Sequence, residues 1–332
     1  MSSKQTPSSS SSSSSNSNTK KRSKGTDALA VVGKKTEIDD STLAAENFFG
    51  SKDSSVRENL PAMNVFPVGP SRINCMIMLD VREKPARLNI VNPGADFEEI
   101  IAELKSMAAD IGATTIKLDY IFITHAHINT FAVANQLLKL GDGSGHIVLH
   151  ERDAFLWDRW ETQATELGLD DLVEGNDDHT IGKPTKLLTE PVTTLKSGET
   201  TIRCLHTPGV SPGSTCFFFE ELEVCYTGCV LLANAIGRTT WIGIKSLHLT
   251  ANARVLRRSI DEILIDQLDP DVQIVPSFGP LSSLRNEVHM NGHLKILSSR
   301  WNAYNDVQEE IKRRLRAQEK LAEDPYGDGL PF

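Results

Sequence analysis

The sequence of 332 residues lacks several features that would place it in a class of protein at once. It has no run of 18 apolar residues, so no membrane span and no membrane partner are expected. Its five cysteines are an odd number without CxxC spacing, which argues against a disulfide framework or a zinc ribbon and favours the reducing cytoplasm. With 39% hydrophobic and 24% charged residues, the composition excludes collagen, coiled coils and wholesale disorder.

The first 26 residues contain no acidic residue, but they contain 12 serines and five basic residues. Such a segment cannot bury apolar surface, so residues 1–60 are predicted to form a disordered Ser-rich tail. Residues 1–26 carry +5, which leaves −14 on residues 27–332 because the total is −9. A body this acidic is not expected to bind nucleic acid. The basic run at 20–24 (KKRSK) makes a nuclear location the alternative to a cytoplasmic one.

The rest of the chain, residues 61–332, alternates between extended apolar runs and helical spacing. Strands are predicted at 64–68, 73–79, 88–91, 118–123, 147–149, 200–206, 215–219, 223–226 and 272–275. Helices are predicted at 95–111, 131–140, 151–160 and 250–268, and further helices at about 282–322 close the chain. Two β-rich halves with flanking helices indicate one domain of packed sheets with helices outside.

Four segments follow one another at predicted strand ends and turns. They are IFITHAHINT at 121–130, HTPGVSPGS at 206–214, YTGCVLLANAIGRTT at 226–240 and IVPSFGP at 274–280. Together they resemble the metallo-β-lactamase superfamily over about residues 63–294. The TPG-x-x-PGS turn, the GRT element and the run GPLSSLRNEV are most similar to the glyoxalase-II-like hydrolases.

The resemblance implies an α/β fold, the αββα four-layer sandwich of that superfamily, with a metal site on loops at one edge of the sheets. In such a site two divalent metals activate a water and polarise a carbonyl, often that of a thioester. The residues that shape these loops match the family; they are Gly209, Gly213, Gly228, Arg238 and Gly279.

Most of the metal-ligand positions that the resemblance implies are altered in this sequence. Two of them keep the family's histidine, namely His125 and His127. The other five hold a different residue: Asn129, Thr130, Val210, Cys229 and Phe278. Of these replacements, Cys229 can bind a metal as a thiolate, whereas Val210 and Phe278 cannot bind one at all.

The strength of the reduced site follows from the number of donors. A four-ligand zinc site is worth roughly 10–16 kcal/mol, or about 3–4 kcal/mol per ligand. Two histidines alone therefore correspond to a Kd on the order of 10 μM. A third ligand from Cys229 would allow one zinc or iron ion, because catalytic zinc usually has three protein ligands. A two-metal site is not expected, and the neutral amide of Asn129 cannot serve as a base.

Each retained donor also has a structural interpretation. His125 and His127 are equally compatible with hydrogen-bonded loop residues, and Cys229 with a small buried hydrophobe. His206 is expected to contribute packing, and the pair His289 and His293 is expected on the surface.

The leading functional hypothesis is a catalytically degenerate glyoxalase-II-like protein, a pseudo-hydrolase that binds a small molecule or a protein partner. The alternative is an active mononuclear hydrolase, with His125, His127 and Cys229 as ligands, acting on a thioester or a related small molecule. A nuclease is disfavoured by the acidic body, because phosphate binding needs basic residues.

Overall fold

The computed structural model describes residues 60–169, 181–240, 251–294 and 313. Apart from Leu60 and Arg313, the predicted tail and the predicted helices after residue 294 lie outside the described residues, so these two parts of the domain assignment stay predictions. All described residues belong to one compact unit of the chain, Thr42–Phe332.

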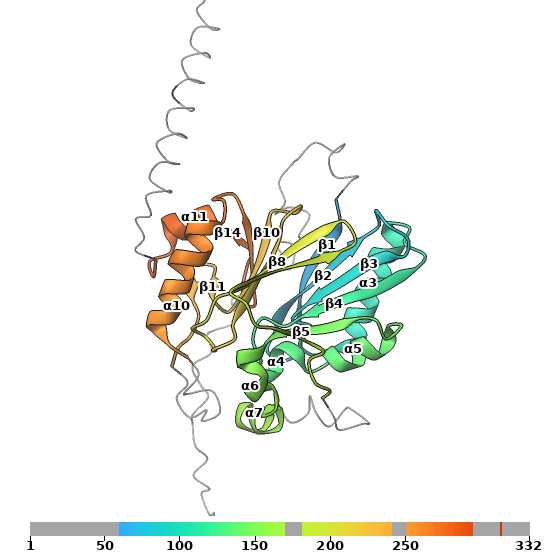
Figure 1. The fold of residues 1–332 in the computed structure, drawn as a ribbon, viewed down its shortest axis with the longest axis horizontal. Coiled ribbons are helices and arrows are strands. Elements are labelled where there is room, and N and C mark those ends of the chain that lie inside the picture. The colour runs from blue at the N-terminus through green and yellow to red at the C-terminus, as the bar shows by residue number, and fades with distance from the viewer. Residues whose placement is uncertain (1–59, 170–180, 241–250, 295–312, 314–332) are drawn as a thin grey trace, which may run out of the picture. The chain divides into compact units, whose positions relative to one another are not determined.

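Two six-stranded sheets form the centre of this unit (Figure 1). The first sheet runs in the order β1 (Ala62–Val68), β2 (Ile73–Asp80), β3 (Ala86–Val91), β4 (Ile116–Phe122), β5 (His146–His150) and β6 (Lys186–Leu188). The second runs in the order β14 (Ser282–Ser283), β13 (Gln273–Pro276), β10 (Val224–Gly228), β9 (Thr215–Phe219), β8 (Thr200–His206) and β7 (Val192–Ser197). A small hairpin of β11 (Leu231–Leu232) and β12 (Ala235–Ile236) follows β10.

Helices cover the outer face of each sheet (Figure 1). On the first sheet lie α3 (Phe97–Asp110) and α5 (Ala134–Leu140). On the second lie α10 (Ala253–Ser259), a π-helical stretch (Ile260–Ile265) and α11 (Leu284–Met290). Three separate buried clusters fill the spaces between the four layers. The predicted α/β class and αββα sandwich are therefore confirmed.

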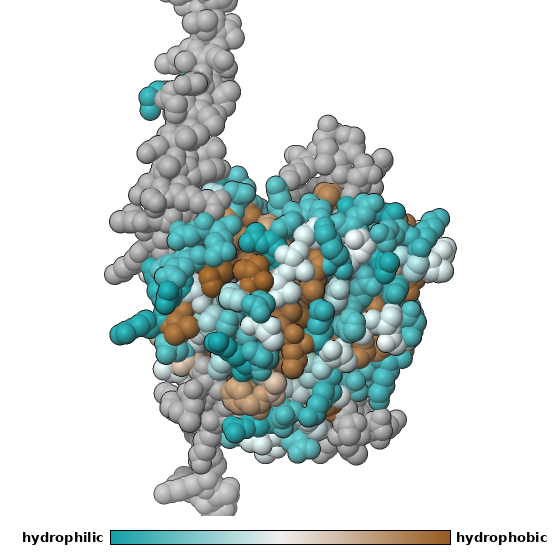
Figure 2. Space-filling view, viewed as in Figure 1, coloured by the Kyte–Doolittle hydropathy of each residue, from teal (hydrophilic) through white to brown (hydrophobic). Residues whose placement is uncertain are grey.

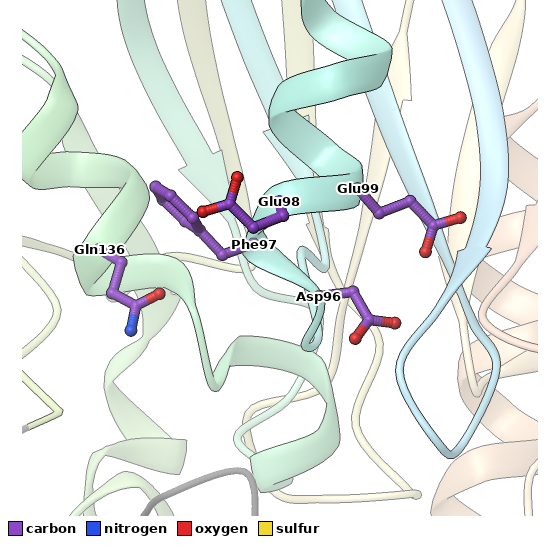
Figure 3. Close-up of a pocket in the computed structure, with 5 residues that line it drawn as sticks. All are labelled: Asp96, Phe97, Glu98, Glu99 and Gln136. Atoms are coloured by element: carbon purple, nitrogen blue, oxygen red, sulfur yellow. The ribbon is translucent and has the colours of Figure 1, made fainter. Parts of the chain in front are cut away.

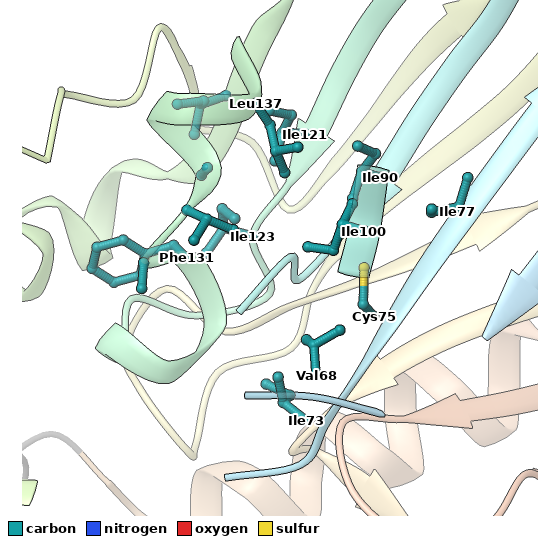
Figure 4. Close-up of a cluster of buried hydrophobic side chains, with 14 of the residues drawn as sticks. Val68, Ile73, Cys75, Ile77, Ile90, Ile100, Ile121, Ile123, Phe131 and Leu137 are labelled. Carbon is teal, nitrogen blue, oxygen red and sulfur yellow. The ribbon is translucent and has the colours of Figure 1, made fainter. Parts of the chain in front are cut away.

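Strand β2 shows how the sequence produces these layers. Its residues alternate in direction, because successive side chains of a strand point to opposite faces. Ile73, Cys75, Ile77 and Leu79 face the helix layer, whereas Met76 and Met78 face the second sheet. Figure 4 shows Ile73, Cys75 and Ile77 in the helix-side cluster, together with Ile100 of α3 and Leu137 of α5. Each such side chain contributes roughly 1.5–3 kcal/mol by burial.

The ends of several strands meet at one edge of the sandwich. Strands β3 to β6 are mutually parallel, so their carboxyl ends share an edge. Strands β10 and β13 are parallel in the second sheet, and the backbone bond from Thr215 N to Thr124 O, 2.8 Å long, joins the two sheets there. We call this place the site edge; it consists of the loops that follow β3, β4, β5, β8, β10 and β13.

Some predicted elements differ from the observed ones. The helix predicted at 131–140 begins earlier, as α4 (Ile128–Phe131), and is interrupted before α5. The helix predicted at 151–160 is a 3-10 turn (Glu151–Asp153) followed by α6 (Ala154–Trp157) and α7 (Trp160–Leu167). Strands β6 and β7 were not predicted because edge strands such as these bury few side chains and show little apolar pattern.

The surface is mixed rather than uniformly polar. In Figure 2, hydrophilic side chains cover most of the visible face and hydrophobic ones lie in small areas between them. Among the described residues, the most exposed large hydrophobic side chain is Met290, at 73%. No helix within the described ranges has the length and apolar character that a membrane span requires.

Candidate functional site

The two predicted histidine ligands lie together at the site edge. His125 and His127 follow β4 directly, at the start of α4, and both are buried. Their ring centroids are 4.4 Å apart and the rings are nearly perpendicular. Burial lowers the pKa of His125 to about 4, and burial together with the neighbouring His125 lowers the pKa of His127 well below its usual range. Both rings are therefore neutral at physiological pH.

His125 is held by a buried network of neutral side chains. Its Nδ1 hydrogen-bonds with Thr124 Oγ1 at 2.8 Å. Asn92, in the loop after β3, donates from Nδ2 to Thr124 Oγ1 at 2.9 Å and to Ser277 Oγ at 3.1 Å. Asn92, Thr124 and Ser277 are all essentially inaccessible to solvent. The network gives the imidazole a fixed orientation, which is a common arrangement around buried histidines.

Thr130, at a position where the family carries a histidine ligand, serves the backbone instead. Its hydroxyl lies 2.8 Å from the carbonyl oxygens of both His125 and His127. The side chain is fully buried, and its hydroxyl is engaged by these two backbone bonds. The neighbouring Asn129 has a buried Oδ1 with no hydrogen-bond partner among the described residues.

Cys229 follows β10 and lies against the core of the second sheet. Burial raises the pKa of its thiol to about 12, although a hydrogen bond with Ser277 opposes the shift. A thiol with this pKa is protonated at neutral pH and is a poor nucleophile. The other four cysteines are buried, as expected for core residues, and all five are free thiols.

Two further ligand positions of the family are occupied by packed apolar side chains. Val210 is 1% exposed and belongs to the cluster between the second sheet and its helices. Phe278 packs against the cluster between the first sheet and its helices. The two apolar layers therefore extend into positions where the family pattern has metal ligands.

Two of the glycines that match the family lie where a side chain would not fit. Gly209 has a φ of 141°, and a Cβ there would lie 2.3 Å from the Cα of Leu256 in α10. Gly228 has a φ of 60°, and a Cβ there would lie 2.9 Å from the Cβ of Thr124. Both positions need glycine for backbone conformation and for close approach. Arg238, by contrast, is exposed on the loop after β12.

Two functional-site residues were missed by sequence reasoning, namely Asp153 and Gln163. The Asp153 carboxylate, after β5, accepts bonds from Gly213 N and Ser211 Oγ, both 2.6 Å, and from Ala126 N at 3.0 Å. Burial raises its pKa to about 6, and these hydrogen bonds oppose the rise. A signal existed in the sequence, since Asp153 follows a buried strand at the same edge as the histidine loop.

Gln163, in α7, clamps the histidine loop from its other side. Its Nε2 donates to Ala126 O at 3.0 Å and to Leu156 O at 2.7 Å, and its Oε1 accepts from Ile128 N at 3.0 Å. These hydrogen bonds all go to backbone groups, so the role of Gln163 is to position the histidine loop.

The remaining predicted histidines lie elsewhere. His206 is half-buried; its ring stacks on His150 with centroids 3.8 Å apart, and its Nε2–H donates to Pro212 O at 2.8 Å. His289 and His293 are exposed at α11 and after it. These outcomes agree with packing for His206 and a surface location for the other two.

The donor set does not fit the metal centre of the family. Within the described residues, no group of three or more His, Cys, Asp or Glu side chains is arranged to hold a metal ion. His125 and His127 supply two neutral nitrogens, while Thr130, Val210 and Phe278 are committed to backbone bonds or apolar packing. The predicted set of His125, His127 and Cys229 stays a prediction, and we derive no reaction step through a metal.

An open hollow of about 800 Å³ lies elsewhere, at the start of α3. It is lined by Asp96, Phe97, Glu98, Glu99 and Gln136. Figure 3 shows Phe97 and Glu98 directed towards Gln136 of α5, and Glu99 directed away from it. No residue predicted for the site lines this hollow.

Comparison with known proteins agrees with the architecture. The family model described as the metallo-beta-lactamase superfamily matches residues 89–277, which is more than half of the chain. The chain belongs to this superfamily. The match spans the histidine loop, the TPG-x-x-PGS turn and Cys229, and it ends next to Phe278.

Individual relatives of this metallo-β-lactamase-fold protein are distant. The hydroxyacylglutathione hydrolase GloC of Haemophilus influenzae is 26% identical over 236 residues, 71% of this chain and 99% of the relative. The structure of the BLEG-1 B3 metallo-beta-lactamase shares 25% identity with a TM-score of 0.56, covering 71% of this chain and 100% of that one.

A second solved structure, that of TTHA1623 in a di-iron-bound form, shares 25% identity with a TM-score of 0.52 and covers 69% of this chain and 100% of that one. A metal-bound structure is thus among those similar to this chain. The chain itself keeps the fold, and its relatives include a glyoxalase-II-like hydrolase at low identity.

Proposed function

We propose that this chain is a catalytically degenerate member of the glyoxalase-II-like branch, which uses the retained fold to bind a small molecule or a protein partner. The observation that carries the proposal is the conversion of ligand positions into packing and backbone bonds at Val210, Phe278 and Thr130. The fold and its loop glycines are kept, whereas five of the seven family ligand positions hold a different residue.

The proposal is supported by the chemistry of the described residues at the site edge, among which the elements of thioester hydrolysis are reduced. Hydrolysis needs an activated water and a group that stabilises the developing oxyanion. Asn129 is neutral and cannot take a proton, and the raised pKa of Cys229 disfavours a thiolate nucleophile. His125 shares its Nδ1 with Thr124, within a network whose members are all buried.

The binding role is supported by how firmly the loops are held. Gln163 and Asp153 fix the backbone of the histidine loop through three hydrogen bonds, each 3.0 Å long. A preorganised loop edge binds with little entropic loss, whether the ligand is a small molecule or a protein surface. The five free thiols support the cytoplasm as the location, with the nucleus as the alternative.

A thioesterase assay tests the proposal. The full chain would be incubated with an acylated glutathione thioester, the substrate class named by its relative GloC, and GloC would serve as the active control. We expect no turnover above the buffer rate, and a rise in Tm with an uncleaved ligand would support binding. Turnover that is abolished in both His125→Ala and Cys229→Ala would instead establish the alternative, an active mononuclear hydrolase.

A further inference from the structure

Protein groups join the two sheets directly at the site edge. The Asp153 carboxylate belongs to the loop after β5 of the first sheet, and it accepts hydrogen bonds from Ser211 and Gly213 in the loop after β8 of the second. Its Oδ2, which accepts the bond from Ser211, also accepts one from the backbone N of Ala126, which lies between the two histidines. One buried carboxylate therefore connects the histidine loop with the TPG-x-x-PGS loop.

Further bonds cross between the sheets around this point. Asn92, after β3, donates to Ser277 Oγ at 3.1 Å, after β13. Thr215 N, in β9, donates to Thr124 O at 2.8 Å, after β4. Asn74 Nδ2, in β2, donates to Pro276 O at 2.8 Å. The residues that form these bonds are buried, so water does not compete for their donors and acceptors.

The loops that these bonds connect are the ones that carry the family's ligand positions. His125 and His127 belong to the first sheet, and Val210, Cys229 and Phe278 follow strands of the second. A metal held by both groups would tie the two sheets together, since each ligand bond restrains its loop. In this chain the same loops are already tied by hydrogen bonds and by the packing of Val210 and Phe278.

The loop after β8 packs tightly against the Asp153 carboxylate. A Cβ at Gly213, in the loop after β8, would lie 2.7 Å from Asp153 Cγ, in the loop after β5. The two loops therefore approach each other as closely as glycine permits.

We infer that the Asp153-centred hydrogen bonds replace a metal as the link between the two sheets at the site edge, and that the domain neither retains nor needs a divalent metal there. The inference concerns the assembly of the edge and holds whether or not the edge binds a ligand.

Metal content and thermal unfolding of the full chain test the inference. After dialysis, elemental analysis should find zinc and iron well below one ion per chain. A chelator and added Zn²⁺ should each leave Tm unchanged, whereas zinc at about a hundredfold its Kd would raise the Tm of a metal-dependent domain by several degrees. Near-stoichiometric metal after dialysis, or a loss of Tm with chelator, would overturn the inference.

Variants of the hydrogen-bonded link provide the second arm. Ser211→Ala removes one of the three bonds to Asp153 and should lower Tm by several degrees, equally with and without Zn²⁺. Asp153→Ala, which removes the acceptor of all three bonds, should do the same if Ser211→Ala does not fold. The matched control is Asp158→Asn, whose side chain is 59% exposed and should leave Tm unchanged. Rescue of Ser211→Ala or Asp153→Ala by zinc, or an unchanged Tm in both, would contradict the inference.

These outcomes are separable from those of the proposed function. Turnover by a metal-free protein would refute the degenerate assignment and leave the inference intact. A retained metal in an inactive protein would refute the inference and leave the degenerate assignment intact.

Discussion

A buried aspartate links the two sheets at each end of the sandwich, and the two carboxylates have opposite electrostatic surroundings. At the end opposite the site edge, Asp80 accepts two bonds from the guanidinium of Arg82, one from the Arg82 backbone N and one from Thr200 of β8. At the site edge, Asp153 accepts bonds only from neutral donors among the described residues. Both carboxylates are almost completely inaccessible to solvent.

The pKa values differ in the direction that these surroundings require. Burial alone raises the pKa of Asp80, but the hydrogen bonds and charge of Arg82 outweigh it and lower the pKa below its usual value. For Asp153 burial dominates, and the pKa rises to about 6. A cation thus stabilises the Asp80 carboxylate as an anion, whereas the Asp153 carboxylate has only hydrogen bonds from neutral donors among the described residues. The comparison shows that, among the described residues, only neutral groups bond to the carboxylate at the site edge.

Removing the cation at the charged end should have the largest effect. Arg82→Met leaves the Asp80 carboxylate, which is 1% exposed, without its salt bridge. We expect a loss of about 3–5 kcal/mol in the free energy of unfolding at neutral pH, measured by urea denaturation. The double variant Asp80→Asn/Arg82→Met should recover much of this loss. A loss below about 1 kcal/mol would place the pair with ordinary surface salt bridges.

At the site edge, the raised pKa of Asp153 predicts a stability that falls as pH rises, opposite in sign to the effect of the lowered pKa of Asp80. Because its folded pKa of about 6 exceeds the unfolded value of 3.8, its stabilising contribution is complete below 3.8 and is lost as pH rises through 6. The lost contribution is about 3 kcal/mol. Urea unfolding of Asp153→Asn at pH 4 and pH 7 should lack this contribution, whereas Asp158→Asn should retain it. Identical pH profiles for Asp153→Asn and the unaltered chain would contradict the assignment.

Gln163→Leu tests how much stability the site edge gains from hydrogen bonds that involve no charged group. The change removes three hydrogen bonds and leaves the backbone groups of Ala126, Leu156 and Ile128 buried without that partner. We expect a loss of about 2–3 kcal/mol in the free energy of unfolding that does not depend on pH. Gln163→Glu would serve as a control of similar size, and its loss should diminish at low pH, where the carboxyl is neutral.

Ser277→Ala should have the smallest effect of the four. It removes the acceptor of one Asn92 bond, while Asn92 keeps its bond to Thr124. The hydrogen bond with the Cys229 thiol is lost as well. We expect about 1–2 kcal/mol from urea denaturation, because only neutral hydrogen bonds are lost and the cavity is small. A loss as large as that of Arg82→Met would mean that the neutral network is as strongly coupled as the charged one.

Much of the fold and part of the site could be predicted from the sequence. The alternation in β2 and the helical spacing in α3 are local patterns, so their elements and layers follow from the residues alone. The order of the four motifs identified the superfamily, and the altered residues at Asn129, Val210 and Phe278 are visible in the sequence. The interruption between α4 and α5 and the strands β6 and β7 were missed, because tertiary contacts decide them.

The sequence by itself determined the layers, the loop glycines and which family ligands are missing, since each depends on residue type and spacing. Only the tertiary structure decided what replaced those ligands. Asp153 lies 58 residues from Ser211, and Asn92 lies 185 residues from Ser277. No local pattern encodes such pairs; they form because the two sheets pack face to face and bring the ends of distant strands to one edge.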